Sequence, residues 1–139
     1  MKKFKYELDF ANIPYQMHDE IVSKINLTEK SVQLCFDDIH FAQEHRKAVI
    51  EFLGMEDVSC ALLMQVYEQK RTKISRGKVY FPEEFDDFFE MNKCSLIVTD
   101  ILVGYGSFLI TGKVIEGDVI GDKRFSLKIE AKTIEYRWF

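Results

Sequence analysis

Residues 124–130, RFSLKIE, and residues 133–139, TIEYRWF, alternate apolar with polar side chains, and this period of two decides the fold. Such alternation is typical of a β-strand that buries one face and exposes the other. The apolar members, which we expect to point inward, are Phe125, Leu127, Ile129, Ile134, Tyr136 and Trp138. The polar members, which we expect to point toward solvent, are Ser126, Lys128, Glu130, Glu135 and Arg137.

The same alternation occurs in the N-terminal part of the chain. Apolar residues occupy every second position in two more stretches, at Phe4, Tyr6, Leu8 and Phe10, and at Val32, Leu34 and Phe36. Longer apolar runs that are rich in β-branched residues predict central strands. These runs are VSCALLMQVY at 58–67, SLIVTDILV at 95–103 and SFLITGKVI at 107–115.

Short segments of turn-forming residues separate these strands, which predicts an antiparallel meander. The segments are TEK at 28–30, GYG at 104–106 and GDVIGD at 117–122. No long helical pattern alternates with the strands, and this disfavours a parallel α/β fold. We predict one mainly β domain over residues 1–139, an antiparallel sandwich or flattened barrel of about eight strands.

Residues 14–25 fit either a helix or a strand. As a helix, the segment begins at Pro14 and aligns Met17, Ile21 and Ile25. As a strand, it follows a turn in MHDE, residues 17–20. We favour the strand, because residues 28–30 then close a hairpin onto the next strand. The strand would place four residues on one face, Ile21, Ser23, Ile25 and Leu27.

Residues 41–54, FAQEHRKAVIEFLG, are also ambiguous. The spacing of Phe41, Ala48 and Phe52, followed by Gly54, suits the end of a helix. The stretch VIEFL within it suits a strand. The sequence is compatible with both a helix and a strand here.

Composition describes a soluble globular chain, with 47% hydrophobic and 30% charged residues among 139. A chain of this size buries enough surface to be stable without a metal or a disulfide. The N-terminal MKKFKYELDF lacks the apolar stretch of a signal peptide, and no other run reaches the length of a membrane-spanning helix. We therefore expect a cytoplasmic protein that does not insert in a membrane.

Residues 81–90, FPEEFDDFFE, predict one short amphipathic helix, near residues 82–90. Pro82 suits the first helical position, and Glu83 and Glu84 would face the positive end of the helix dipole. On a helical wheel the four phenylalanines, Phe81, Phe85, Phe88 and Phe89, fall within one arc. Four carboxylates gather on the opposite side, those of Glu83, Asp86, Asp87 and Glu90.

The acidic excess of the chain is concentrated in this helix. The ten residues 81–90 carry five acidic residues and no basic one, whereas the rest of the chain carries 18 acidic and 19 basic residues. A basic segment, KRTKISRGK at 70–78, comes just before it. The neighbouring acids would repel phosphate within a Debye length, which disfavours nucleic-acid binding.

The arrangement of the four helix carboxylates favours the binding of a protein partner over metal binding or acid catalysis. A metal or a catalytic acid needs carboxylates that converge in a partly desolvated cleft, whereas these radiate from a convex surface. A solvated face is the first interpretation, a surface that docks a basic protein is the second, and a metal or catalytic role is the third. The partner-binding candidates are Glu83, Asp86, Asp87 and Glu90.

Metal sites outside the helix have little support. Asp38 and His40 are spaced by two and could share one side of a strand, with His45 as a third ligand that must be assumed. His18 and Asp19 are more typical of a turn. The three cysteines, Cys35, Cys60 and Cys94, lie in apolar runs without a CxxC pair and are expected to be small buried hydrophobes.

Catalytic motifs are also missing. The chain has no GxGxxG or GxxxxGK[ST] for phosphates, no HExxH for zinc and no GxSxG for a serine nucleophile. We therefore predict no enzyme activity, no cofactor and no metal.

The order MHDEIVSKINLTEKSVQLCFDD, followed by an apolar strand and a closing SLKIEAKTIEYRW, resembles small uncharacterised bacterial all-β proteins. Some of these are similar to immunity proteins, which neutralise a toxin from the same genome. The resemblance implies a cytoplasmic binding protein without catalysis. No catalytic residue carries over from it.

Two other functions remain alternatives. In a homodimer, the basic segment 70–78 would meet the acidic helix of a second copy, and Tyr136, Trp138 and Phe139 would form an exposed edge. In a small β-barrel, the 12 phenylalanines and 6 tyrosines would line a cavity for an apolar ligand.

Overall fold

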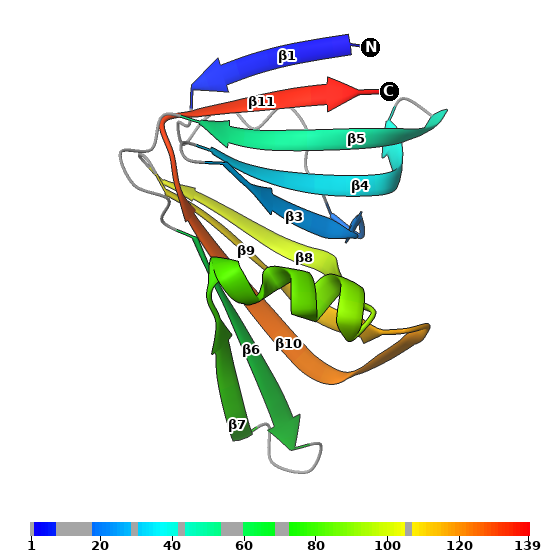
Figure 1. Cartoon of the computed structure of the whole chain (residues 1–139), viewed down its shortest axis with the longest axis vertical. Helices are drawn as coiled ribbons and strands as arrows, with labels where there is room; N and C mark the ends of the chain where they lie inside the picture. Colours follow the sequence, from blue (N-terminus) through cyan, green and yellow to red (C-terminus); the bar gives the residue numbers. More distant parts are fainter. Residues whose placement is uncertain are drawn as a thin grey trace.

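A computed structural model of the chain describes residues 2–7, 18–28, 31–41, 44–53, 60–68, 73–104 and 107–139. The strands in these ranges form two antiparallel sheets (Figure 1). Sheet A has the order β1 (Lys2–Glu7), β11 (Thr133–Trp138), β5 (Glu44–Leu53), β4 (Ser31–Phe41) and β3 (Lys24–Leu27). Sheet B has the order β2 (Ile21–Val22), β8 (Cys94–Gly104), β9 (Ser107–Glu116), β10 (Val119–Glu130), β6 (Cys60–Glu68) and β7 (Lys73–Tyr80).

The two sheets pack in a sandwich-like arrangement, and neither of them closes into a barrel. β1 and β3 are the edges of sheet A, and β2 and β7 are the edges of sheet B. A single buried cluster takes side chains from both sheets and from the short helical segment that follows β7. The predicted all-β antiparallel fold is thus confirmed as a sandwich, and the flattened-barrel alternative is wrong.

The alternation of apolar and polar residues correctly predicts the inner faces of three strands. The predicted inward residues of β4, β10 and β11 are all buried: Val32, Leu34, Phe36, Phe125, Leu127, Ile129, Ile134, Tyr136 and Trp138. Tyr136 and Trp138 therefore form no exposed edge, since β11 lies between β1 and β5. That part of the homodimer hypothesis is wrong. Glu135, expected in solvent, is buried on the outer face of sheet A.

Neither ambiguous segment forms a helix where the structure describes it, and both contribute strands. After a turn at His18 and Asp19, the chain enters β2, and residues 44–53 form β5 rather than a helix. Residues 14–17 lie outside the described ranges. Residues 44–53 form a strand rather than a helix because they pair with β4 on one side and with β11 on the other.

The strand after the turn is broken at Ser23, which corrects the single face predicted for this stretch. Ile21 is 41% exposed while Val22 is fully buried, so Ile21 does not share the buried face of Ile25. The Ser23 N–H donates to the Cys35 carbonyl at 2.9 Å. The break moves the chain from the edge of sheet B to the edge of sheet A.

Two details of sheet B differ from the expected meander. The predicted turn at 117–122 is shorter, because β10 already begins at Val119 and the turn is at Gly117 and Asp118. Gly117 has a φ of 61°, which favours glycine. The pairing of β8 with β9 also shifts register between Val98 and Asp100, which inserts Thr99 as a bulge residue.

Candidate functional site

The acidic candidate residues lie on the helical segment 82–91 between β7 and β8. A 3₁₀ turn, η1 (Pro82–Glu84), begins it, and a π-helical turn, η2 (Asp87–Met91), ends it. The Glu84 N–H donates to the Phe81 carbonyl at 2.8 Å, and the Phe81 N–H donates to the Glu84 carboxylate at 3.3 Å. The two bonds fix the start of the segment, and the one from the Phe81 N–H to the Glu84 side chain is the bond that the N3 residue supplies in a capping box.

Three phenylalanines anchor the segment in the core. Phe85, Phe88 and Phe89 are buried, and the rings of Phe88 and Phe89 meet edge to face with centroids 4.9 Å apart. Phe81 is different, since 52% of it is exposed. The predicted inward position of Phe81 is wrong because this residue precedes the first helical turn, where the helical wheel does not apply.

Four carboxylates of the segment are exposed, and we call this set the acidic face. Its members are Glu83, Asp86, Asp87 and Glu90, and all four are exposed. Because the buried phenylalanines hold the backbone, the acidic face is presented by a fixed scaffold rather than by a loop. The predicted division of the helix into a buried aromatic side and an acidic side is therefore confirmed for seven of its eight residues.

One cation from sheet A contacts this surface. Lys24 Nζ lies 3.0 Å from Glu90 Oε1, and both side chains are largely exposed. The hydrogen bond and the charge of Glu90 raise the pKa of Lys24, and Asp86 raises it further. One lysine beside four carboxylates leaves the acidic face with a net negative charge.

Large apolar side chains flank the acidic face at both ends. Phe81 comes just before the segment and Met91, which is 77% exposed, closes it. Exposed apolar side chains beside a charged rim are the composition of many protein interfaces. The helical pattern predicts Phe81 in the core, and Met91 lies beyond the predicted segment. The position of Met91 after the last carboxylate, outside the phenylalanine arc, is a signal that could have identified it.

No group of three or more His, Cys, Asp or Glu residues close enough to hold a metal is found in the described part of the chain. Asp37 and Asp38 are both exposed at a bulge in β4. His40 lies opposite His45 in the register of β4 and β5, and the side chains of these histidines lie outside the description. The Asp38–His40 hypothesis is thus untested.

The turn at His18 and Asp19 agrees with the sequence. Asp19 has a φ of 64°, and its carboxylate lies 3.3 Å from His18 Nδ1 on an exposed surface. The basic segment 70–78 lies only partly within the described residues, where its backbone contributes to β7. Its proposed contact with a second copy is not tested by this structure.

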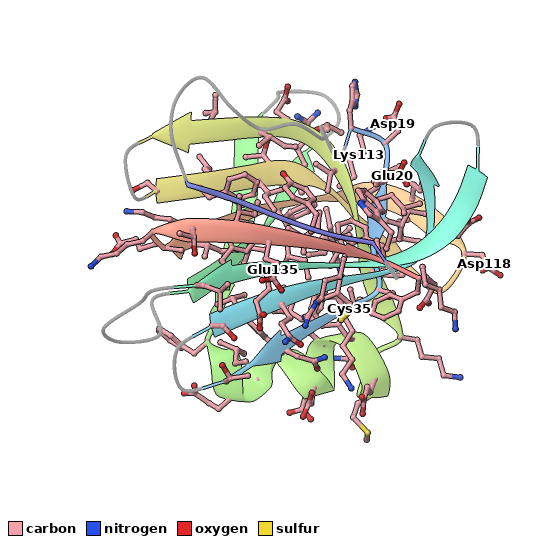
Figure 2. The ribbon with its side chains drawn as sticks, turned by 90° about the horizontal axis from the view of Figure 1, so that it is seen from above. Asp19, Glu20, Cys35, Lys113, Asp118 and Glu135 are labelled. Carbon is pink, nitrogen blue, oxygen red and sulfur yellow. The ribbon has the colours of Figure 1, made fainter. Side chains whose placement is uncertain are left out.

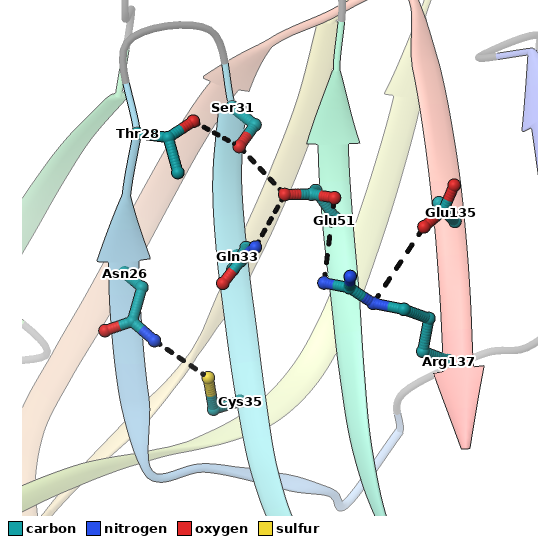
Figure 3. A network of polar contacts seen from close by, with 8 residues as sticks. All are labelled: Asn26, Thr28, Ser31, Gln33, Cys35, Glu51, Glu135 and Arg137. Carbon is teal, nitrogen blue, oxygen red and sulfur yellow. Dashed lines mark hydrogen bonds and ion pairs between the residues drawn. The ribbon is translucent and has the colours of Figure 1, made fainter. Parts of the chain in front are cut away.

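A second polar cluster, the Glu51 network, lies on the outer face of sheet A (Figure 3). The buried Glu51 carboxylate accepts hydrogen bonds from Ser31 Oγ at 2.9 Å and from Gln33 Nε2 at 2.6 Å. Arg137 Nη2 lies 3.6 Å from Glu51, and Arg137 Nε lies 3.9 Å from Glu135. Thr28 and Ser31 share a hydrogen bond of 2.6 Å that extends the network to the β3–β4 hairpin.

The Glu51 network is best explained as structural. Glu51 and Glu135 occupy directly opposite positions on β5 and β11, where like charges destabilise a sheet. The Arg137 guanidinium contacts both carboxylates and offsets that repulsion. The network therefore ties β4, β5 and β11 together, and sequence alternation alone could not indicate it.

The cysteines are less buried than expected. Cys35 and Cys94 are free and partly exposed, which corrects the prediction of full burial for these two residues. Cys35 and Glu135, both labelled in Figure 2, alternate with the buried residues of β4 and β11 and therefore belong to the outer face of sheet A. Partial burial raises the pKa of the Cys35 thiol, and its sulfur accepts a hydrogen bond of 3.5 Å from Asn26. The side chain of Cys60 lies outside the description.

Comparison with protein-family models, with curated proteins and with solved structures finds no significant match. Over the described ranges, no helix combines the length and the apolar character that a bilayer crossing requires.

Proposed function

We propose that this chain is a non-catalytic binding protein that docks a basic protein through the acidic face and the flanking side chains of Phe81 and Met91. The observation that carries the proposal is that one segment, residues 81–91, buries aromatic side chains on one side and exposes carboxylates on the other. Three phenylalanines are buried, four carboxylates are exposed, and an apolar side chain is exposed at each end.

Such a surface suits a cationic partner for two physical reasons. Clustered carboxylates steer a basic protein during diffusion and set its orientation, an effect that weakens as salt rises. Large apolar side chains supply the desolvated contacts that dominate binding energy in most interfaces. A scaffold fixed by core packing also reduces the entropy lost on association.

The specific role that we favour is of the immunity type, in which the chain neutralises a cationic toxin in the cytoplasm. The strand order and short motifs in the sequence resemble such proteins, and the acidic face complements the basic active sites of many nucleases. Both the toxin partner and the cytoplasmic location belong to this proposal.

The test begins with affinity capture from a lysate of the source organism. Three baits are compared: the wild type, a face variant with Glu83→Gln, Asp86→Asn, Asp87→Asn and Glu90→Gln, and a control variant with Asp37→Asn, Glu116→Gln, Asp118→Asn and Glu130→Gln. The control variant loses the same number of exposed carboxylates elsewhere on the surface.

The proposal expects one basic protein, identified by mass spectrometry, that the wild type and the control variant retain and the face variant loses. The pair is then purified, and its affinity is measured as salt rises. Capture by all three baits would contradict the proposal, because binding would then not depend on the acidic face.

A further inference from the structure

The hairpin that joins β9 to β10 exposes two large apolar side chains. Val119 is 67% exposed and Ile120 is 52% exposed, and both follow the turn at Gly117 and Asp118. Apolar surface in water is unfavourable, and two adjacent exposed apolar residues are more informative than one that is isolated on a surface. The hairpin is therefore a candidate contact surface.

Backbone contacts hold this hairpin beside the end of the helical segment. The Gly117 N–H donates to the Lys93 carbonyl at 3.0 Å, and Glu116 lies opposite Cys94 in the register of β8 and β9. Lys93 comes two residues after Met91, the exposed apolar residue that ends the helical segment. The hairpin and the helical segment that carries the acidic face are thus neighbours at one end of sheet B (Figure 1).

The conformation of the hairpin does not depend on the two exposed side chains. Lys123 on β10 forms an ion pair with Glu116 on β9, which links the two strands. Ile120 lies opposite Ile115, which is buried, and Val119 lies opposite Glu116. The strand pairing fixes the backbone, so Val119 and Ile120 are held outward on a defined scaffold.

The charges around this apolar surface select a basic occupant. At the hairpin, Glu116 is paired with Lys123, and Asp118 and Lys93 are both exposed, so its charges balance. The net negative charge comes from the acidic face next to it. That charge repels the anionic headgroups of a membrane. It also disfavours a symmetric dimer, because a two-fold axis would bring two acidic faces together.

We propose that the basic partner of the acidic face also contacts Val119 and Ile120, and that it presents a large apolar side chain next to its cations. This inference rests on the proposed docking function and adds the chemistry that the partner must carry. The acidic face steers the partner, and the apolar contact at the hairpin slows its dissociation, because desolvated apolar contacts dominate binding energy.

Two synthetic peptides of equal length and equal lysine content are the probes. Leucine separates the lysines in one peptide, and serine separates them in the other. Isothermal titration measures the affinity of the protein for each peptide at low ionic strength. We expect the wild type to bind the leucine peptide about tenfold more tightly than the serine peptide, as burial of an apolar side chain predicts.

Three variants assign this preference. The hairpin variant carries Val119→Thr and Ile120→Thr, which keep β-branched side chains suited to a strand. The matched control carries Ile21→Thr and Leu102→Thr, which also truncate two exposed apolar residues. The hairpin variant should bind both peptides with equal affinity, whereas the control should keep the tenfold preference. The face variant should bind both peptides more weakly than the wild type and should keep the preference for leucine.

The outcomes separate this inference from the docking function. A face variant that binds more weakly, together with a wild type that shows no preference for leucine, would overturn the inference and leave the docking function standing. A preference that survives in the hairpin variant would do the same. Unchanged affinities in the face variant would contradict the docking function and, with it, the inference.

Two further measurements test other occupants of the hairpin. Co-sedimentation with vesicles of phosphatidylcholine and phosphatidylserine tests a membrane, and sedimentation velocity over a range of protein concentrations tests a second copy. We expect neither vesicle binding nor self-association. Either interaction, if the wild type shows it and the hairpin variant loses it, would overturn the inference.

Discussion

The Lys24 ammonium group and the Glu90 carboxylate, 66 positions apart in the sequence, meet at 3.0 Å. This ion pair joins β3, at the edge of sheet A, to the end of the helical segment. Exposed ion pairs contribute little to folding stability, so its main consequence is electrostatic. Lys24 neutralises part of the acidic face that we propose as the docking surface.

Replacing Lys24 by Gln should therefore strengthen the binding of a basic partner. The substitution removes a positive charge beside the acidic face, and the gain should disappear as salt screens the interaction. Thermal unfolding should change very little. Isothermal titration of the purified complex at low and high salt checks this prediction, and weaker binding at low salt would contradict it.

Phe88→Ala and Phe81→Ala should have opposite effects on folding and binding. Phe88 is buried in the core, so its truncation should cost about 3–5 kcal/mol of unfolding free energy. Phe81 is exposed, so Phe81→Ala should leave stability nearly unchanged and should weaken partner binding by about 1–2 kcal/mol. Urea denaturation and titration of the complex measure the two effects. A large loss of stability in Phe81→Ala would show that Phe81 belongs to the core.

The contrast between Phe88 and Phe81 shows which buried residues the helical periodicity of the sequence can predict and which it cannot. A period of 3.6 residues correctly predicted Phe85, Phe88 and Phe89 as buried, although the segment is a 3₁₀ turn followed by a π-helical turn rather than a regular α-helix. Phe81 lies one residue before the first turn, where the backbone leaves β7, and the periodicity has no bearing on it. Element ends are thus where the candidate site was predicted least well.

For the strands, too, the sequence pattern predicted some features and not others. Alternation predicted the inner faces of β4, β10 and β11 from local pattern alone. It did not predict the pairing of β1 with β11, which joins the two ends of the chain, nor the break at Ser23. These features depend on contacts between distant segments, as does the position of Glu135 opposite Glu51 on β5.

Gly112→Ala should be strongly destabilising, whereas Gly121→Ala should be tolerated. A Cβ at Gly112 meets the Ile97 backbone and the Phe125 ring, while a Cβ at Gly121 meets nothing within 4 Å. Overpacking at the first site should cost about 1–3 kcal/mol or more. Gly121→Ala should change stability by less than about 1 kcal/mol. Parallel urea titrations compare the two variants, and equal stability would contradict the close approach of β8 and β9.

Arg137→Leu should destabilise the protein by about 1–3 kcal/mol, because it removes the guanidinium that contacts both Glu51 and Glu135, which occupy opposite positions on β5 and β11. Adding Glu51→Gln to this variant should recover part of the loss, because it removes one of the two charges. A double-mutant cycle measures the coupling, which we expect at about 0.5–3 kcal/mol. Strict additivity would show that Arg137 does not act through Glu51.

Cys35 should react slowly with iodoacetamide at pH 8. Its thiol pKa is raised in the folded protein, mainly by burial, so the reactive thiolate is scarcer than in the unfolded chain. As pH rises, the Cys35 thiol therefore loses its proton in the unfolded chain before it does so in the folded protein. The contribution of Cys35 to the free energy of unfolding falls as pH rises above the ordinary thiol pKa. Labelling with and without urea, localised by mass spectrometry, tests the rate. Equal rates in the two states would contradict the raised pKa.

The central claim is that the acidic face binds a basic protein, and the most direct measurement is the affinity of the identified partner for three purified proteins. These are the wild type, the face variant and the control variant, each at several salt concentrations. We expect the face variant to bind the partner at least about tenfold more weakly than the wild type and to lose most of the salt dependence, while the affinity of the control variant stays close to that of the wild type. Equal affinity and equal salt dependence for all three proteins would contradict it.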